Sequence, residues 1–426
     1  MIRTLGLTLS TLALGMVSTT AIAQDQIIRV GNLLTDAASS PSGPATLIVR
    51  DGRIAEIRQG SEPVTASGAT IIDLSTKTVM PGLIDLHVHL TGDPGGDFWK
   101  ETTEPTEWGV VVGAKNALLT AKAGFTTVRE AGSSQYSAYA LRRGTAEGII
   151  PGPRIVAAGP ALSIVGGHGD VSGFTEDVNE LLTSGYSCTG AVECAARVRK
   201  ASRAGADVIK ITATGGVLSQ QGRGLDAQFT SAEMQSIADT AHSLGLKVMA
   251  HAHGARGIEA ASRAGIDTIE HGTFADEAAL KVMKANNTAM VPTLMAFQGV
   301  SEGLGKGIYT PVVEEKIRMT MGRVGKAVDM AKRMGVPIAF GTDAGVFDHG
   351  RNAEELQLMV DAGLTAREAV ASATTVAAKM LDMENEIGRI AVGYSADLIA
   401  FDGNPLDDVR KLEQVDWVMV RGRVID

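Results

Sequence analysis

The sequence predicts an α/β protein, a (β/α)8 TIM-like barrel with a small β-sandwich domain formed from both termini. The central part of the chain, residues 81–384, alternates short apolar runs with helical stretches. Such alternation implies parallel strands joined by helices. The eight runs favour a closed barrel over an open sheet. The flanking segments, 24–80 and 385–426, are instead rich in β-type residues and turns, so we assign them to the sandwich.

The terminal strands are expected where β-branched and apolar residues lie between turns. The dipeptide Asp51-Gly52 predicts a tight hairpin turn, and Gly422 a second one near the end of the chain. The expected strands are Ile27–Val30, Ala45–Arg50, Arg53–Ile57, Thr70–Asp73, Asp397–Phe401, Trp417–Arg421 and Arg423–Ile425.

In the central part, helix signals lie between the apolar runs. Thr230 and Glu233 form a capping box before the expected helix Met234–Leu244, and Gly245 ends it. No phosphate-binding glycine fingerprint opens the first unit, which argues against a dinucleotide-binding fold. The expected barrel strands are Leu83–His87, Thr126–Arg129, Arg154–Ala157, Val208–Thr212, Lys247–Ala250, Thr268–Glu270, Ala289–Pro292 and Ile338–Gly341.

Residues 1–23 have the pattern of a secretory signal peptide. An apolar stretch runs from Leu5 to about Val17 behind Arg3, and Ala21-Ile22-Ala23 resembles a cleavage site. A membrane anchor is the alternative, but the stretch is shorter than the ~20 residues that span a bilayer comfortably. We expect cleavage near Ala23, a periplasmic or secreted protein, and no membrane attachment of the mature chain.

Composition and charge exclude some kinds of partner. The chain has a net charge of −9, and no run of lysine and arginine suggests a nucleic-acid-binding face. Its two cysteines, Cys188 and Cys194, could form a disulfide in an exported protein; two free thiols are the alternative. The short loop would limit the stabilisation to about 2.4 kcal/mol. We expect a small-molecule or peptide substrate.

Residues that bind metals lie at the ends of several predicted strands. His87 and His89 end the first strand, and their spacing places both imidazoles on one side. His251, His271 and Asp343 end the fifth, sixth and eighth strands. Alone, each would more often be a loop residue or a helix cap. Together they converge on the carboxyl end of the barrel, where such folds build active sites, and imidazoles with carboxylates suit zinc and similar metals.

Lys210, inside the fourth strand, indicates a site for two metals. A charged ammonium would repel cations, and neutralising a free lysine at pH 7 costs about 4.6 kcal/mol. An apolar strand lowers that cost because burial disfavours the charge. Reaction with carbon dioxide would then give a carbamate, which can bridge two cations. We therefore interpret Lys210 as carboxylated; a mononuclear site with Lys210 as a spectator is the alternative.

This set of residues resembles the amidohydrolase superfamily in its binuclear, carboxylated-lysine form. The phrase Met80–Asp85 before the paired histidines is also typical, and the resemblance covers essentially the whole mature chain. Gly166–Asp170 and Ala213–Val217 make the chain look closest to the Xaa-Pro dipeptidase and imidazolonepropionase-like branch. That branch includes carboxypeptidase-like enzymes and ochratoxin A amidohydrolases, and the chain looks particularly similar to the latter.

The resemblance implies a cofactor of two divalent metal ions, zinc foremost, with manganese and cobalt as alternatives. His87, His89 and Asp343 would hold one metal, and His251 and His271 the other, with Lys210 between them. Asp343 would act as general base and then general acid. The resemblance also implies a homo-oligomer, some relatives being octameric.

The expected reaction is hydrolysis of an amide bond in N-acyl amino acids or dipeptides. Ochratoxin A, which would give ochratoxin alpha and phenylalanine, is a fitting substrate. The alternatives are a cyclic-amide hydrolase of the dihydroorotase or imidazolonepropionase type, an Xaa-Pro dipeptidase, and a non-catalytic metal-binding protein on a retained barrel.

Further residues are candidates for substrate contacts. His168 and His253 lie on loops at the same end of the barrel, where we assign them to a substrate carbonyl or carboxylate; a structural role is the alternative. A carboxypeptidase-like enzyme also needs a cation for the free carboxylate. Arg223, after the fourth strand, and Arg351, after the eighth, are the candidates. His349 could reach the rim of the pocket.

Overall fold

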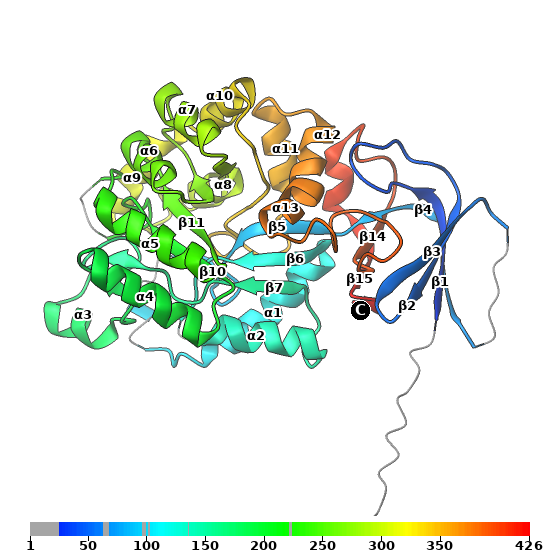
Figure 1. Ribbon diagram of the computed structural model, residues 1–426, viewed down its shortest axis with the longest axis horizontal. Helices are drawn as coiled ribbons and strands as arrows, with labels where there is room; N and C mark the ends of the chain where they lie inside the picture. Colours follow the sequence, from blue (N-terminus) through cyan, green and yellow to red (C-terminus); the bar gives the residue numbers. More distant parts are fainter. Residues whose placement is uncertain (1–24, 63–67, 96–98, 101–102, 135, 221–223) are drawn as a thin grey trace, which may run out of the picture.

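The computed structural model describes residues 25–62, 68–95, 99–100, 103–134, 136–220 and 224–426. The expected signal peptide and Arg223 lie outside the described residues. In Figure 1 a body of parallel strands surrounded by helices lies beside a sheet that contains strands from both ends of the chain. Among the described residues no helix is long and apolar enough to cross a membrane.

Both ends of the chain contribute to one seven-stranded sheet, with the order β16-β15-β14-β4-β1-β2-β3. β1 pairs antiparallel with β2 and parallel with β4, and β2 continues into β3 through the predicted turn at Asp51-Gly52. The strands are β1 (Gln26–Leu33), β2 (Ala45–Arg50), β3 (Arg53–Gln59), β4 (Thr70–Pro81), β14 (Leu398–Phe401), β15 (Val415–Val420) and β16 (Arg423–Val424).

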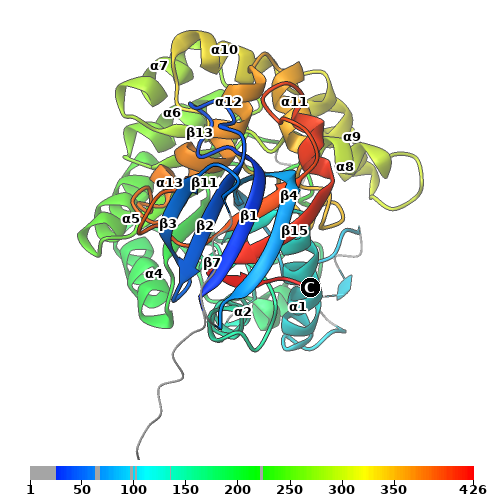
Figure 2. The same ribbon diagram turned by 90° about the vertical axis from the view of Figure 1, so that its right-hand side faces the viewer.

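The terminal domain differs from the expected sandwich, because its strands form one hydrogen-bonded sheet. The reason is the length of β4, of which the sequence predicted only Thr70–Asp73. Thr70–Val79 pairs with β1, and Thr78–Pro81 pairs with β14, so β4 joins the strands of the two termini. Figure 2 shows β1 to β4 side by side, with β15 near them. Ile28, Leu398 and Met419 are buried in its core.

The central strands form two parallel sheets. Their positions agree with seven of the eight predicted barrel strands, and they are almost entirely buried. The first sheet contains β5 (Leu83–Val88), β6 (Phe125–Glu130) and β7 (Arg154–Ala157). The second contains β10 (Val208–Thr212), β11 (Lys247–Ala252), β12 (Thr268–His271) and β13 (Ala289–Val291).

The predicted eighth strand, Ile338–Gly341, is not a regular strand. Its residues form no continuous ladder, although an isolated bridge joins Ile338 to Met290 of β13 and the carbonyl of Phe340 accepts the N–H of Leu86 in β5. Shortly after it, Asp343 has a left-handed backbone (φ 65°), which is incompatible with a continuous strand. A second isolated bridge joins Ala344 to Val88 of β5, so the segment still contacts one edge of each sheet.

The helices pack around these sheets, as Figure 1 shows for α4 to α7. The predicted capping box of Thr230 and Glu233 is confirmed at the start of α5. The helices are α1 (Trp108–Lys122), α2 (Ser137–Glu147), α3 (Glu176–Leu182), α4 (Ala191–Ala204), α5 (Ser231–Ser243), α6 (Ala255–Arg263), α7 (Glu277–Ala285), α8 (Leu294–Glu302), α9 (Pro311–Met321), α10 (Lys326–Met334), α11 (Glu354–Asp361), α12 (Ala366–Ala371) and α13 (Ala377–Met380).

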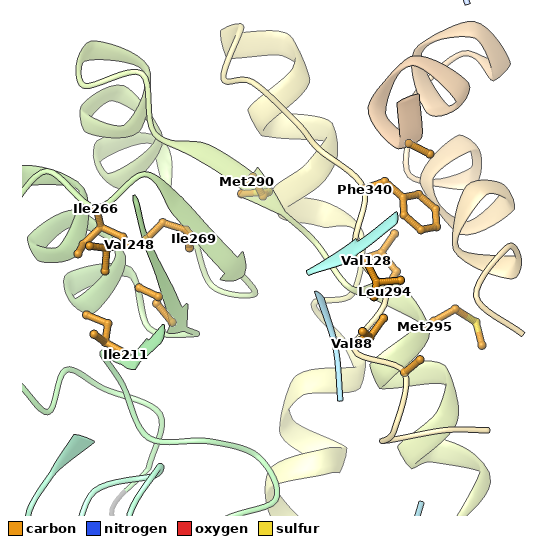
Figure 3. Packing of buried hydrophobic residues seen from close by; sticks show 14 of the residues in the cluster. Val88, Val128, Ile211, Val248, Ile266, Ile269, Met290, Leu294, Met295 and Phe340 are labelled. Carbon is orange, nitrogen blue, oxygen red and sulfur yellow. The ribbon is translucent and has the colours of Figure 1, made fainter. Parts of the chain in front are cut away.

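Apolar side chains between strands and helices hold the strand ends in place. Figure 3 shows Val88, Val128 and Ile211 from different strands among the buried residues. Burying one such side chain contributes about 1.5–3 kcal/mol.

A disulfide joins Cys188 to Cys194 at the start of α4, so the disulfide and not the pair of free thiols is present.

Candidate metal centre and active site

The predicted histidines meet at the carboxyl ends of the parallel strands. The ring centroids of His251 and His271 lie 4.6 Å apart, those of His87 and His271 5.3 Å, and those of His87 and His89 5.4 Å. Asp343 Oδ1 lies 3.4 Å from His87 Nε2 and 3.3 Å from His89 Nε2. The fold thus brings five residues from distant parts of the sequence into one cluster.

Lys210 of β10 belongs to the same cluster. Its Nζ lies 3.3 Å from His87 Nε2, and the residue is only 4% exposed. Burial lowers the pKa of the Lys210 ammonium, although Glu270 and Asp343 act in the opposite direction. A lowered pKa favours the neutral amine, which is the form that can react with carbon dioxide.

Hydrogen bonds outside the cluster fix the rings of the first histidine pair. His87 Nδ1 lies 2.8 Å from Glu270 Oε2, and His89 Nδ1 lies 2.9 Å from the carbonyl oxygen of Gly132. Both partners are acceptors, so in each neutral ring Nδ1 carries the proton. In the neutral rings the Nε2 atoms face Asp343 with free lone pairs, as metal ligands require. Burial lowers the pKa of His89, but its hydrogen bond to Asp343 raises that pKa overall.

The second histidine pair is held in the same manner. Thr293 Oγ1 donates to the carbonyl of Pro292 at 2.8 Å, so it must accept from His271 Nδ1, which lies 2.6 Å away. His251 Nε2 faces the carbonyl oxygen of Gly215 at 3.3 Å. The remaining nitrogens, His271 Nε2 and His251 Nδ1, lie 2.9 Å apart. With both protons on the outer nitrogens, these two atoms present lone pairs to the same point, an arrangement that suits a cation.

Burial keeps most of this cluster uncharged. It lowers the pKa of His87, His251 and His271 well below the usual value. Burial alone would raise the pKa of Asp343, but the neighbouring His87 and His89 lower it overall. Histidine binds metals as the neutral imidazole and aspartate binds them as the carboxylate, so this cluster is in the protonation state that metal binding requires.

Backbone strain is concentrated at this site. His271 (φ 71°), Thr293 (φ 48°) and Asp343 (φ 65°) all adopt the left-handed conformation, which is uncommon for residues other than glycine. Each such residue costs about 1–3 kcal/mol. At His271 the turn has a visible effect, because Glu270 and His271, which alternation would place on opposite faces of a strand, both approach His87.

Glu270 and its partner Arg129 also belong to the site, although the sequence pattern did not predict them there. Glu270 is fully buried and accepts hydrogen bonds from Arg129 Nη2 at 3.0 Å and from Thr268 Oγ1 at 2.5 Å. Burial raises the pKa of Glu270, although Arg129 opposes that shift. The signal was present in the sequence, because both are charged residues inside runs that were otherwise predicted as buried strands.

Asp85 connects the strand of His87 to the segment of Asp343. Its carboxylate accepts hydrogen bonds from the backbone N–H of His87 at 3.0 Å and from Thr342 Oγ1 at 2.7 Å. Asn352 Nδ2 donates to it at 2.9 Å. Burial raises the pKa of Asp85 to about 6, and these hydrogen bonds oppose the shift. Asp85 thus holds the two protein segments that carry His87 and Asp343 against each other.

The predicted substrate contacts, His168 and His253, both lie beside His251. Their ring centroids are 4.3 Å and 4.6 Å from that of His251. His253 also stacks on His271 at 4.8 Å, and His168 Nδ1 lies 2.6 Å from Ser219 Oγ. Burial lowers the pKa of each to about 3. Both are therefore neutral groups next to the cluster.

Arg351 does not face this cluster. Its guanidinium pairs with Glu302 at 3.0 Å and with Glu354 at 2.8 Å near the surface, so its charge is already balanced there.

His349 lies behind His89 and not at a pocket rim, because its Nε2 donates to the carbonyl of His89 at 3.2 Å. Lys316 of α9, which the sequence pattern did not single out, is a buried cation whose Nζ donates to the carbonyl of Ser219 at 2.6 Å.

Comparison with known proteins agrees with this geometry. Residues 78–425 match the Amidohydrolase family. The chain belongs to that family. It is 32% identical to ochratoxinase from Aspergillus niger over 428 aligned positions, which cover 94% of this chain and 85% of the relative. The predicted resemblance and the expectation of an enzyme are thereby confirmed: the chain is a hydrolase of this family.

Solved structures give the same assignment. A Xaa-Pro dipeptidase with bound methionine has 36% sequence identity and a TM-score of 0.87, with 94% of this chain and 99% of that chain covered. Ochratoxinase from A. niger has 29% identity and a TM-score of 0.80, with 94% and 95% covered. This amidohydrolase therefore shares the α/β fold of these neighbours, with the seven-stranded sheet as a separate domain beside the parallel strands.

Proposed function

We propose that this amidohydrolase uses two divalent metals to cleave the amide bond that precedes a C-terminal residue. The substrates would be N-acyl amino acids or dipeptides, and ochratoxin A would be cleaved to ochratoxin alpha and phenylalanine. One observation carries the proposal: inward-facing histidine nitrogens converge with Asp343 and Lys210 in a buried cluster. The names of the two relatives, ochratoxinase and Xaa-Pro dipeptidase, support the substrate class.

The donor atoms of the cluster fit divalent cations. Two groups of three residues each have ligand atoms within 4.8 Å of one another: His251 with His253 and His271, and His87 with His271 and Asp343. Imidazole nitrogen with carboxylate oxygen suits zinc. Manganese and cobalt are the alternatives. When bound, such metals lower the pKa of water to about 7 and polarise a carbonyl group. We assign His87, His89 and Asp343 to one metal, His251 and His271 to the other, and carboxylated Lys210 to both.

Asp343 is the residue that would move the proton. Its lowered pKa makes it a carboxylate at neutral pH, so it can accept a proton from the attacking water. It can then deliver that proton to the leaving nitrogen. An amide requires this step because the nitrogen leaves readily as a neutral amine but poorly as an anion. His168 and His253, both neutral, would hold the substrate carbonyl or carboxylate.

The proposal also includes a closed barrel, export of the protein and a homo-oligomer. We infer that the two parallel sheets close into an eight-stranded barrel through residues 338–344, which bond to both β13 and β5. Export to the periplasm or the medium is supported by the disulfide, which forms in oxidising compartments. A homo-oligomer is proposed from the resemblance alone.

A substrate screen tests the proposed reaction. The protein would be prepared with bicarbonate and zinc, manganese or cobalt, and offered N-acyl-phenylalanines, Xaa-Pro dipeptides, ochratoxin A, hydantoins and dihydroorotate. We expect turnover of the linear amides, with a free amino acid as one product. Turnover of only the cyclic substrates would favour the cyclic-amide alternative. No turnover together with fewer than about one metal per chain would favour the non-catalytic alternative.

A further inference from the structure

The helix that follows β13 begins in an unusual way. Thr293 is the residue before α8, a position where threonine normally accepts a hydrogen bond from the first N–H groups of the helix. Its side chain does not do so here. Instead its hydroxyl donates to the carbonyl of Pro292 and accepts from His271 Nδ1 at 2.6 Å. The helix therefore needs another acceptor for its N-terminus.

Glu355, in the first turn of α11, provides that acceptor. Its Oε1 accepts the N–H of Leu294 at 2.9 Å, and its Oε2 accepts the N–H of Met295 at 2.6 Å. Glu355 is fully buried, a location that is costly for a carboxyl group unless it is hydrogen-bonded. The N-terminal end of a helix also favours negative charge. Both oxygens are thus used to cap a helix that is distant in the sequence.

We propose that Glu355 is a positioning residue for His271. By capping α8 it leaves the Thr293 hydroxyl available to His271 Nδ1, which keeps the proton on that nitrogen and directs Nε2 toward the metal. Without Glu355, the hydroxyl of Thr293 would be drawn to the uncapped N–H groups of Leu294 and Met295. The inference rests on the proposed function, because it concerns the metal that His271 would hold.

The segment that carries Glu355 also contacts the other half of the site, but through a different residue. Asn352 donates to Asp85, which in turn accepts the backbone N–H of His87. Glu355 acts on the side of His271, whereas Asn352 acts on the side of His87. A change at Glu355 should therefore affect one metal and spare the other.

The central experiment is a metal titration of Glu355→Gln. Glutamine keeps the size of the side chain but can accept only one of the two N–H bonds, because its amide nitrogen is a donor. We expect about 10-fold weaker affinity for one of the two zinc equivalents in competition with a chelator, as for other residues that orient metal ligands. The second equivalent and KM should change little, while kcat falls. Glu354→Gln is the matched control, since Glu354 pairs with Arg351 near the surface.

A second pair of variants leaves Glu355 unchanged and tests the step through Thr293, which the inference requires. Thr293→Val removes the hydroxyl and should weaken the same metal, whereas Thr293→Ser keeps the hydroxyl and should bind as the wild type does. If Glu355 acts through Thr293, Glu355→Gln combined with Thr293→Val should lose no more affinity than either change alone. Fully additive losses would show that Glu355 acts by a different route and would overturn the inference.

A readout without metal separates this inference from the proposed function. Nitrogen-15 NMR of the metal-free protein reports which ring nitrogen of His271 carries the proton. We expect the proton on Nδ1 in the wild type and a mixture in Thr293→Val and Glu355→Gln. Unchanged spectra and unchanged metal binding in both variants would overturn the role of Glu355. A wild type that binds fewer than two metals but shows the expected spectra would contradict only the binuclear function.

Discussion

The Nε2 atom of His271 lies 2.9 Å from the Nδ1 atom of His251, although the other nitrogen of each ring already faces an acceptor. Burial holds both rings neutral, so two lone pairs point toward each other. A divalent cation between them would remove that repulsion and bind both. Metal should therefore stabilise the folded protein as well as activate it.

Metal removal is the first prediction. Dialysis against a chelator should lower the melting temperature, and zinc should restore it. A ligand at 100 times its Kd stabilises a folded protein by about 2.7 kcal/mol. Differential scanning calorimetry at several zinc concentrations measures the effect. Magnesium, which prefers oxygen ligands, is the control and should restore little. A melting temperature that ignores zinc would contradict a metal site at these histidines.

Lys210→Met should lose metal and activity. The substitution removes the amine that lies 3.3 Å from His87 Nε2, and methionine can neither form a carbamate nor bridge two cations. We expect less than one metal per chain, and a fall in kcat/KM larger than the 10–100-fold typical of residues that only orient ligands. Lys281→Met on the exposed face of α7 is the control. Full turnover by the Lys210 variant would refute the bridging role.

Glu270→Gln should reduce both stability and metal affinity. The change leaves the buried guanidinium of Arg129 without its charged partner, which typically costs about 3–5 kcal/mol. It also removes the carboxylate that holds His87 Nδ1. Urea unfolding measures the first effect. Glu259→Gln breaks a more exposed pair with Arg263 and should cost less than about 1 kcal/mol. Equal losses in the two variants would show that burial of the Arg129 pair has little energetic consequence.

His349 gives a pH dependence with a definite sign. Burial lowers the pKa of His349 to about 4, below the ordinary value of 6.5, so the folded state holds the neutral ring. Between pH 6.5 and 4 the unfolded chain binds a proton that the folded chain does not. The stability that His349 contributes, relative to a glutamine in its place, should therefore be complete above pH 6.5. It should then shrink by up to about 1.4 kcal/mol per pH unit as the pH falls toward 4.

The measurement for His349 is urea unfolding of the wild type and His349→Gln across this pH range. The comparison cancels the contributions of Asp85 and other groups that titrate in both proteins. A difference between the two proteins that stays constant from pH 7 to 4 would mean that His349 has the same pKa in the folded and unfolded states, and would contradict the lowered pKa.

The disulfide should contribute a modest amount of stability. Cys188→Ser combined with Cys194→Ser should lower the free energy of unfolding by about 2 kcal/mol, because the bond closes a loop of only a few residues. A reducing agent should shift the urea midpoint of the wild type toward that of the double variant. It should leave the double variant itself unchanged. If it leaves the wild-type midpoint unchanged as well, the bond is not formed in solution.

Much of the fold could be predicted because its signals are local. The apolar runs of the central part correspond to β5, β6, β7 and β10 to β13, and the capping box at Thr230 lies where expected. The two failures depend on backbone conformation and strand pairing that the local residue pattern does not show. Ile338–Gly341 is followed by the left-handed Asp343, and β4 is longer than predicted because strands from both termini pair with it.

The sequence by itself determined the candidate ligands, since strand-end histidines, Asp343 and Lys210 are chemical types whose positions follow from the strand pattern. Only the tertiary structure decided how they are held. Glu270 meets His87 across 183 residues of sequence, and Glu355 meets Leu294 across 61. Such contacts depend on how the strands and helices pack. Each of these buried carboxylates accepts a hydrogen bond from a donor that is close in space but distant in the sequence. The local sequence pattern does not identify that partner. The tautomer of each histidine, and therefore the direction of its lone pair, can be assigned only in the folded chain.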